Sequence, residues 1–308
     1  MAGMGNLYHA LPKAELHVHL EGAIEPETLR ELAPGLSLEE IRERYEYTNF
    51  LEFLKSFKWV VDQLGTPEQY ALATRRLLER LESENVQYAE IIFSAGIAIW
   101  RGLEIAPIFD AVRREALDSR VTVWWLFDAV RQFGVEHVNR VAELAAERTG
   151  DGVVGFGIGG DEDRGPARLF GEAFGIAKKA GLHLTAHAGE TGGPDSVWAA
   201  LELGAERIGH GIRSIEDPVL MKHLRDHNIP LEVSISSNVC TGSAGSLRQH
   251  PVRRLYDAGV PITLNTDDPA MFHTTLSREY EIAARELGFT EYELRHIAEN
   301  GFRYGFRS

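Results

Sequence analysis

Eight short runs rich in apolar and β-branched residues recur along the chain, and stretches with helical periodicity separate them. Apolar runs of this length, bounded by turn residues, are typical of buried strands. The predicted strands are 14–19, 87–93, 121–128, 153–160, 182–189, 207–211, 230–237 and 261–268. Strand and helix alternating eight times predict an α/β protein, a (β/α)8 TIM barrel that takes up residues 1–308 as one domain.

The longest connection in this pattern lies between the first two strands. Predicted helices elsewhere include 68–84, 104–117, 135–148, 166–180 and 195–203. The first connection runs from Leu20 to Val86, far longer than one crossover helix needs, so extra helices are expected in it. Within it, residues 50–64 carry one apolar face at helical spacing. That helix either packs on the barrel or forms a wall or lid over the pocket, since connections after strands emerge at the catalytic face.

The charge balance and the single cysteine restrict the partners of the chain. The 46 acidic residues exceed the 32 basic ones, and a net charge of -14 opposes binding to nucleic acid or to an anionic membrane. A neutral or cationic small molecule fits better. Cys240 alone cannot form an intramolecular disulfide or a cysteine-rich zinc site. No apolar run approaches the length of about 18 residues that a membrane span needs, so we expect a cytoplasmic enzyme.

Histidine and acidic residues are predicted at the C-terminal ends of four strands. They are His17 and His19 on the first strand, His187 on the fifth, His210 on the sixth, and Asp267 and Asp268 on the eighth. Residues two apart on a strand share a face, and the active sites of barrels lie at this end of the strands. Imidazole nitrogen and carboxylate oxygen suit zinc and its first-row neighbours. Three histidines and one aspartate therefore predict a site for one metal ion and a water.

Each of these residues also has a simpler explanation. A pair of histidines two apart can be a polar strand end, and His187 or His210 alone is more often a histidine hydrogen-bonded within the fold. Asp267 and Asp268 could cap the next helix through its backbone N–H groups. Their shared position at one rim of the barrel favours the metal site.

Five motifs, in order along nearly the whole chain, together resemble the adenosine deaminase family. They are His17-x-His19, His187-Ala-Gly-Glu190, Gly209-His210-Gly211, Ser236-Ser237-Asn238 and Thr266-Asp267-Asp268-Pro269. The resemblance implies a zinc-dependent (β/α)8 barrel that replaces the 6-amino group of a purine with oxygen and releases ammonia. It also implies one zinc ion per chain and a small purine substrate.

The same resemblance implies roles for individual residues. The zinc ligands would be His17, His19, His187 and Asp267. Zinc lowers the pKa of its water toward 7 and so supplies hydroxide at neutral pH. Glu190 would give a proton to purine N1 as hydroxide adds to C6. His210 and Asp267 would orient the hydroxide and stabilise developing charge.

The substrate contacts implied by the resemblance leave the exact purine open. Asp268 would hold N7, the Gly160 backbone N–H would meet N3, and His19 and Glu21 would also contact the substrate. Adenosine-selective members typically have aspartate where this chain has Glu21, on the ribose 5′ side, and many have aspartate at the position of Gly157. Adenosine, a 5′-modified adenosine such as aminodeoxyfutalosine, adenine and N6-modified AMP all remain candidates.

Other functions fit these motifs less well. Residues 155–160 satisfy the G-x-G-x-x-G pattern of dinucleotide sites, but the three acidic residues that follow would repel phosphate. A binuclear amidohydrolase acting on esters or cyclic amides would need a carboxylated lysine on the fourth strand, which has no lysine. Cytidine-type zinc deaminases need a Pro-Cys-x-x-Cys segment, which a chain with one cysteine cannot contain. If the chain were a binding module without catalysis, we would expect at least one of these motif residues to be replaced, and none is.

Overall fold

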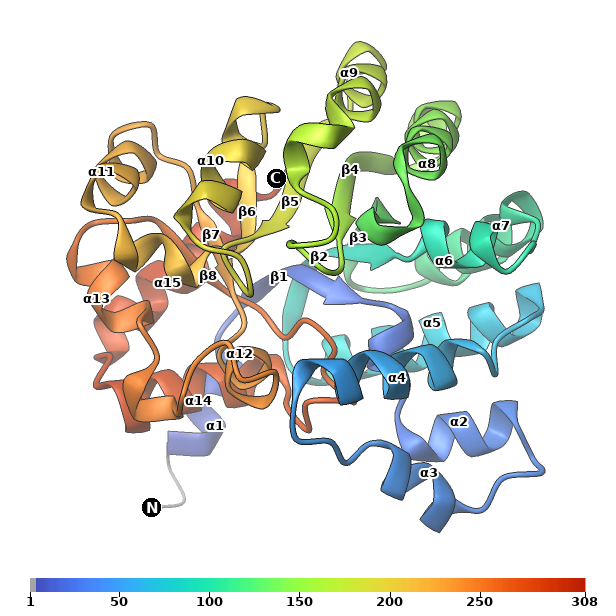
Figure 1. The fold of residues 1–308 in the computed structure, drawn as a ribbon. Coiled ribbons are helices and arrows are strands. Elements are labelled where there is room, and N and C mark those ends of the chain that lie inside the picture. The colour runs from blue at the N-terminus through green and yellow to red at the C-terminus, as the bar shows by residue number, and fades with distance from the viewer. Residues whose placement is uncertain (1–3, 308) are drawn as a thin grey trace.

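Eight parallel strands form one closed ring in the computed structural model, which describes residues 4–307 (Figure 1). They are β1 (Lys13–His19), β2 (Val86–Phe93), β3 (Thr122–Val130), β4 (Val153–Gly159), β5 (His183–Ala188), β6 (Arg207–His210), β7 (Leu231–Val233) and β8 (Ile262–Leu264). Each strand pairs with the next, and the ring closes where Val18 of β1 bridges Asp267 after β8. The predicted (β/α)8 barrel is confirmed.

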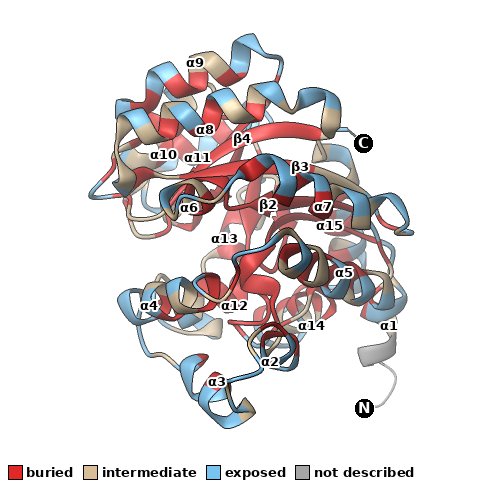
Figure 2. Ribbon diagram, turned by 90° about the vertical axis from the view of Figure 1, so that its right-hand side faces the viewer, coloured by how far each residue is buried: buried red, intermediate tan, exposed pale blue. Residues whose placement is uncertain are grey.

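Helices cover the outside of the barrel, with exposed outer faces and buried inner faces (Figure 2). They are α1 (Met4–Ala10), α5 (Pro67–Ser83), α7 (Ile105–Leu117), α8 (Val135–Glu147), α9 (Gly171–Lys179), α10 (Pro194–Glu202), α11 (Pro218–Asp226), α13 (Val252–Asp257), α14 (Leu276–Leu287) and α15 (Glu291–Tyr304). Two short helices, α6 (Ala95–Trp100) and α12 (Ile235–Cys240), follow β2 and β7 at the rim instead. Side-chain caps fix several starts. Thr66 and Gln69 form a reciprocal capping box at α5, and Thr290 and Glu293 form another at α15.

The long connection between β1 and β2 contains the extra helices that the sequence predicts. A short 3-10 turn, η1 (Glu21–Ala23), is followed by α2 (Pro26–Leu32), α3 (Leu38–Arg44) and α4 (Phe50–Val61) before α5. Figure 1 shows α2, α3 and α4 together on one side of the barrel. The apolar helix expected within residues 50–64 is α4.

Three predicted elements differ from the structure. The strand expected over 261–268 ends at Leu264, and beyond it Asp267 forms only an isolated bridge with Val18. The strand expected over 230–237 ends at Val233, and the helix α12 begins at Ile235. The buried carboxylate of Glu279 accepts the backbone N–H groups of Ile235 and Ser236, at 2.8 and 3.1 Å, which ends the strand ladder and starts a helix. The helix expected over 166–180 is divided into a 3-10 turn at 167–170 and α9.

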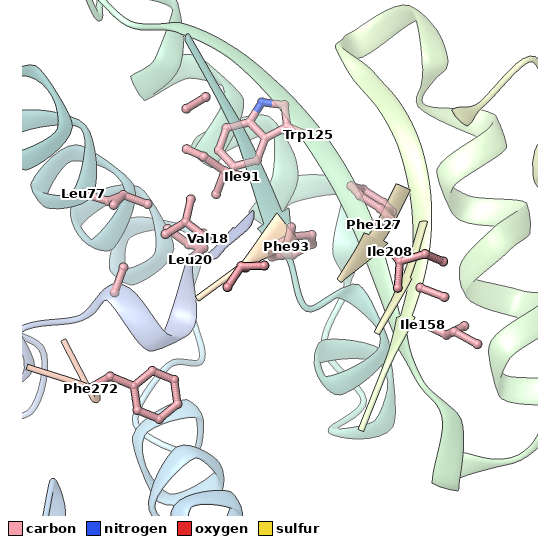
Figure 3. Packing of buried hydrophobic residues seen from close by; sticks show 14 of the residues in the cluster. Val18, Leu20, Leu77, Ile91, Phe93, Trp125, Phe127, Ile158, Ile208 and Phe272 are labelled. Atoms are coloured by element: carbon pink, nitrogen blue, oxygen red, sulfur yellow. The ribbon is translucent and has the colours of Figure 1, made fainter. Parts of the chain in front are cut away.

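The main apolar core lies between the sheet and the helices. Figure 3 shows side chains from several strands in this layer, among them Val18, Phe93, Phe127 and Ile208. The rings of Phe93 and Phe127 lie 5.4 Å apart, and both side chains are fully buried. Each fully buried side chain of this size contributes about 1.5–3 kcal/mol to folding. This layer holds the strands, and therefore the side chains at their ends, in fixed positions.

The inside of the barrel is charged beneath its rim. Arg207, 1% exposed, forms ion pairs of 2.5 Å with both Glu90 and Glu232. Its guanidinium lies 3.6 Å from the centre of the Phe306 ring, so the C-terminal segment packs against the same arginine. A buried charge is stable only when it is paired in this way. The network fixes the position of Glu232 directly beneath the side chains at the rim of the barrel.

Candidate metal centre and active site

A β-bulge in β1 sets the direction of the two histidines of that strand. Glu15 pairs with Ala89 and Val18 with Ile91, so β1 has one residue more than β2 between these pairs. Glu15 therefore lies outside the barrel, where its carboxylate accepts hydrogen bonds from Thr266. His17, beyond the bulge, points into the barrel together with His19.

Four side chains that the sequence predicts as ligands meet at the rim of the barrel. The Nε2 atom of His187 lies 3.1 Å from Nε2 of His17 and 3.2 Å from Nε2 of His19. The Oδ1 atom of Asp267 lies 3.4 Å from Nε2 of His17 and 3.4 Å from Nε2 of His19. All four ligand atoms lie within 4.8 Å of one another, so together they surround a space of the size of one metal ion.

Hydrogen bonds to the Nδ1 atoms of His17 and His187 direct the Nε2 lone pairs of these rings toward the predicted metal position. His17 Nδ1 donates to Oε2 of Glu232 at 2.7 Å, and His187 Nδ1 donates to the carbonyl of Ile158 at 3.2 Å. Such partners fix the tautomer and the ring orientation of metal-binding histidines. Burial lowers the pKa of His19 to about 3 and that of His187 well below its usual value. Both are therefore neutral imidazoles, the form that binds a metal.

The two adjacent aspartates after β8 have separate environments. Asp267 has a positive φ of 64°, a conformation rare for this residue type, and its Oδ2 accepts a hydrogen bond from Ser237 at 2.6 Å. Asp268 lies against Gly22, where a Cβ atom would come within 1.7 Å of Oδ1. That oxygen is buried and has no hydrogen-bond partner among the described residues. Burial, with the charge of Asp267, raises the pKa of Asp268 well above its usual value.

Glu190 stands on a loop that another glutamate holds in place. The carboxylate of Glu162 accepts the backbone N–H groups of Gly189, Glu190, Thr191 and Gly192 at 2.8–3.0 Å. Burial raises the pKa of Glu190, and its carboxyl group faces the cavity described below. The sequence indicated for Glu162 only a repulsion of phosphate. Its structural role could not be read from spacing, because the loop that it holds lies 27 to 30 residues away.

His210 completes the set of rim residues. Its Nε2 atom lies 3.7 Å from Oε2 of Glu190 and 3.9 Å from Oδ2 of Asp267. The residue is 1% exposed and has a positive φ of 61°, so the backbone is held in an unusual conformation to direct the ring. The ring therefore borders the predicted ligands and Glu190.

A cavity of about 680 Å³ opens from this cluster to the surface. Phe50, Phe53 and Phe57 of α4 line one side, so this helix is a wall of the pocket. On another side the rings of Trp100 and Phe133 stack 4.3 Å apart, with 13° between their planes. Trp100 is 62% exposed although it borders the cavity. The polar cluster is thus the floor of a pocket whose outer part is aromatic.

Glu21 lies outside the residues that line this cavity. It is 1% exposed, and its carboxylate accepts the backbone N–H of Ser94 at 3.2 Å. Burial raises the pKa of Glu21 to about 7. Its predicted contact with the substrate stays a prediction, and the contact present in the structure joins β1 to the end of β2.

The glycine pattern of residues 155–160 lies within and just after β4, so it does not open a helix. A Cβ atom at Gly157 would lie 3.1 Å from Cγ2 of Thr185 and 3.3 Å from Oδ1 of Asp128. The glycine therefore leaves room for Asp128, a buried carboxylate at the cavity for which the sequence indicated no role. Gly160 lines the cavity with a φ of +93°, and a Cβ there would lie 2.3 Å from Oε1 of Gln132.

Comparison with known proteins gives the family of the chain. The adenosine deaminase family model matches residues 12–308. The chain belongs to the adenosine deaminase family. It is 39% identical to an aminodeoxyfutalosine deaminase of Streptomyces coelicolor over 96% of this chain and 80% of that protein. It is 38% identical to an adenine deaminase of Rhizobium leguminosarum bv. trifolii over 96% of this chain and 95% of that protein.

A solved structure extends the comparison to the metal. An amidohydrolase of Burkhoderia ambifaria with bound zinc superposes with a TM-score of 0.91 at 27% identity, covering 99% of this chain and 88% of that one. This deaminase is thus a hydrolase that acts on carbon–nitrogen bonds, in a metal-dependent family whose members named above deaminate adenine-type compounds. Among residues 4–307, no helix is long and apolar enough to cross a membrane.

Proposed function

We propose that this protein is a zinc-dependent deaminase of adenine nucleosides that carry an aromatic 5′ extension, with aminodeoxyfutalosine, whose 5′ chain ends in a benzoate ring, as the first candidate. The observation that carries this proposal is the cavity, which continues from the polar floor to an aromatic mouth. We further propose that the barrel acts as one domain, because every strand is a neighbour of the next in a single ring.

One zinc ion would be held by the four rim side chains whose ligand atoms lie within 4.8 Å of one another. They are His17, His19, His187 and Asp267. A bound zinc ion lowers the pKa of a coordinated water and supplies hydroxide at neutral pH. Among the described residues, these four form the one group of three or more possible ligands, and β4 has no lysine for a second ion. This favours one metal over the binuclear alternative.

The purine would be bound through its three ring acceptors, because the floor offers a donor for each. Burial raises the pKa of Glu190 and of Asp268, so both carboxyl groups can carry the proton needed to donate to N1 and to N7. The backbone N–H of Gly160 would donate to N3, and the absence of a side chain lets the ring approach. A purine without these acceptors would leave the buried Oδ1 of Asp268 without a partner.

The proton transfers follow from the positions of Glu190 and His210. Glu190 would protonate N1 as hydroxide adds to C6, so that the ring accepts the extra electron pair. The Nε2 of His210 and Oδ2 of Asp267 would hold the attacking oxygen in position. The Glu190 carboxylate would then carry the proton of the new C6 hydroxyl to the amino group, and the C6–N bond would break to leave the 6-oxo group and ammonia.

The mouth of the cavity favours an aromatic 5′ group over a phosphate. Arg101 already donates to the carbonyls of Val61 and Asp62, and Lys58 is paired with the Asp62 carboxylate at 2.5 Å. Arg101 and Lys58 are committed to protein groups, and the one remaining lysine among the described lining residues, Lys55, does not by itself form a phosphate cradle. The stacked rings of Trp100 and Phe133 instead offer an apolar surface. N6-modified AMP is therefore the weaker alternative, and free adenine would leave the aromatic mouth unused.

The proposal is tested by ammonia release from a panel of purines. Adenine, adenosine, deoxyadenosine, AMP, N6-methyl-AMP, methylthioadenosine and aminodeoxyfutalosine should be compared by kcat/KM at one zinc content. We expect the highest value for aminodeoxyfutalosine, followed by methylthioadenosine, whose 5′ group is apolar. A preference for adenine or for the nucleotides would contradict the proposed substrate class while leaving the reaction type intact.

Trp100→Ala tests the aromatic mouth. Removing the ring should raise KM for the 5′-extended nucleoside by roughly 5- to 20-fold, in line with about 1–2 kcal/mol for an aromatic contact, and should change the KM for adenosine little. Steady-state kinetics on both substrates measure the difference. Tyr292→Ala is the control, because Tyr292 is an aromatic residue, 82% exposed, that does not line the cavity. Equal effects of Trp100→Ala on both substrates would contradict the assignment.

Glu232→Gln tests the support beneath the metal centre. Burial opposes ionisation of Glu232, but Arg207 and His17 outweigh it and lower its pKa, so the group is a carboxylate that accepts from His17. The amide should weaken zinc affinity by roughly 10- to 100-fold. Competition with a chelator measures this affinity, with Glu206→Gln, a change at the other end of the barrel, as control. Unchanged affinity would show that Glu232 does not support the metal site.

A further inference from the structure

A line of buried side chains runs from His210 away from the cavity. Nδ2 of Asn238 lies 3.0 Å from Nδ1 of His210, and Nε2 of His250 lies 3.1 Å from Oδ1 of Asn238. The backbone N–H of Val252 then donates to Nδ1 of His250 at 3.2 Å. All three side chains are at most 3% exposed. The line ends at the backbone of α13, and neither Asn238 nor His250 lines the cavity.

The direction of every hydrogen bond in this line follows from its last member. A backbone N–H can only donate, so Nδ1 of His250 must be the acceptor and Nε2 must carry the hydrogen. That hydrogen is donated to Oδ1 of Asn238, which fixes the amide with its NH2 group toward His210. Nδ1 of His210 is therefore an acceptor, and the hydrogen of this ring lies on Nε2, on the side of Glu190 and Asp267.

We propose that Asn238 and His250 are positioning residues that hold His210 in the tautomer with its hydrogen on Nε2. This inference rests on the proposed function, in which an oxygen adds to the purine beside His210. With hydrogen on Nε2, the ring donates to that oxygen as its charge changes. With hydrogen on Nδ1, the ring would present a lone pair, which can accept a hydrogen bond from that oxygen but cannot stabilise its negative charge.

Burial makes the arrangement rigid. It lowers the pKa of His250 to about 3, so this imidazole stays neutral and has one hydrogen to donate. Rotating the Asn238 amide by half a turn would bring its NH2 group against the hydrogen on His250 and its oxygen against the lone pair of His210. Both hydrogen bonds of the amide would be lost inside the protein, where no water replaces them.

The tautomer can be observed directly by nitrogen NMR of the zinc-loaded enzyme. Protein labelled with 15N in its histidine side chains gives separate ring-nitrogen shifts, and comparison with His210→Asn identifies the signals of His210 among the 12 histidines. We expect a protonated Nε2 and an unprotonated Nδ1. A protonated Nδ1 in the wild-type enzyme would overturn the inference, whichever purine the enzyme deaminates.

Asn238→Asp reverses the end of the line without a change in side-chain size. Its carboxylate can only accept at the position of Nδ2, so His210 should move its hydrogen to Nδ1, and kcat should fall by about 10²- to 10⁴-fold, as when other enzymes lose the correct histidine tautomer. KM should change much less. Zinc content and Tm are measured alongside. Retention of kcat within a few-fold, or of hydrogen on Nε2, would contradict the proposal.

A pair of changes at His250 remains informative if the aspartate variant fails to fold. His250→Gln keeps an N–H donor for Oδ1 of Asn238, whereas His250→Phe keeps a ring of similar size and removes the donor. We expect the glutamine variant to retain the Nε2 tautomer and most of kcat. The phenylalanine variant should show mixed tautomers of His210 and a lower kcat. Equal NMR spectra and equal kcat for the two variants would exclude a relay through His250.

Discussion

Glu190→Gln should abolish turnover while the metal stays bound. The glutamine amide can still donate a hydrogen bond to purine N1, but it cannot transfer a proton, so the ring cannot accept the attacking oxygen. A loss of kcat of at least about 10²- to 10⁴-fold is expected for a missing proton-transfer group. Ammonia release measures the rate, and the metal content of the purified variant measures zinc.

The design of this experiment separates catalysis from folding. Glu299→Gln is the matched control, because the Glu299 side chain is 80% exposed and lies outside the site. It should retain the wild-type rate. Substantial activity of Glu190→Gln would refute the proton-transfer role, and loss of its zinc would mean that Glu190 supports the metal site instead.

His17→Ala should empty the metal site. The change removes one of the four ligand atoms and also leaves the Glu232 carboxylate, which accepts from His17 at 2.7 Å, without this partner. Zinc content measured after dialysis should fall far below one per chain, and activity should fall with it, because the free energy of metal binding depends on the complete ligand set.

The control for His17→Ala is another histidine of the barrel. His183 lies at the start of β5, at the opposite end of that strand from His187, and pairs with Glu206. His183→Ala should keep its zinc. Unchanged metal content in His17→Ala would contradict the assignment of His17 as a ligand.

The barrel and the residues at its rim could be predicted because both depend on local sequence. Apolar runs mark the strands, and a residue at the end of a strand such as His187 or Asp267 lies at the rim whatever the helices do. Closure of the ring brings His17 and Asp267 together although they are 250 positions apart, since the first and last strands are neighbours.

The supporting residues could not be predicted, because their roles arise from contacts between distant parts of the chain. Glu232 meets its histidine across 215 residues, and His250 reaches the site only through a second side chain. A buried glutamate in a strand reads as an ordinary polar position until the fold gives it a partner. The predicted end of the seventh strand was wrong for the same reason, since the carboxylate that ends β7 belongs to Glu279 of α14.

Zinc titration of the metal-free enzyme tests the central claim, that the two ends of the chain form one metal centre for deamination. Zinc is added in known amounts, and ammonia release from the best substrate of the panel is measured at each point. Activity should be absent without metal and should rise linearly to a plateau at one zinc per chain. A plateau at two per chain, or full activity without metal, would contradict this account.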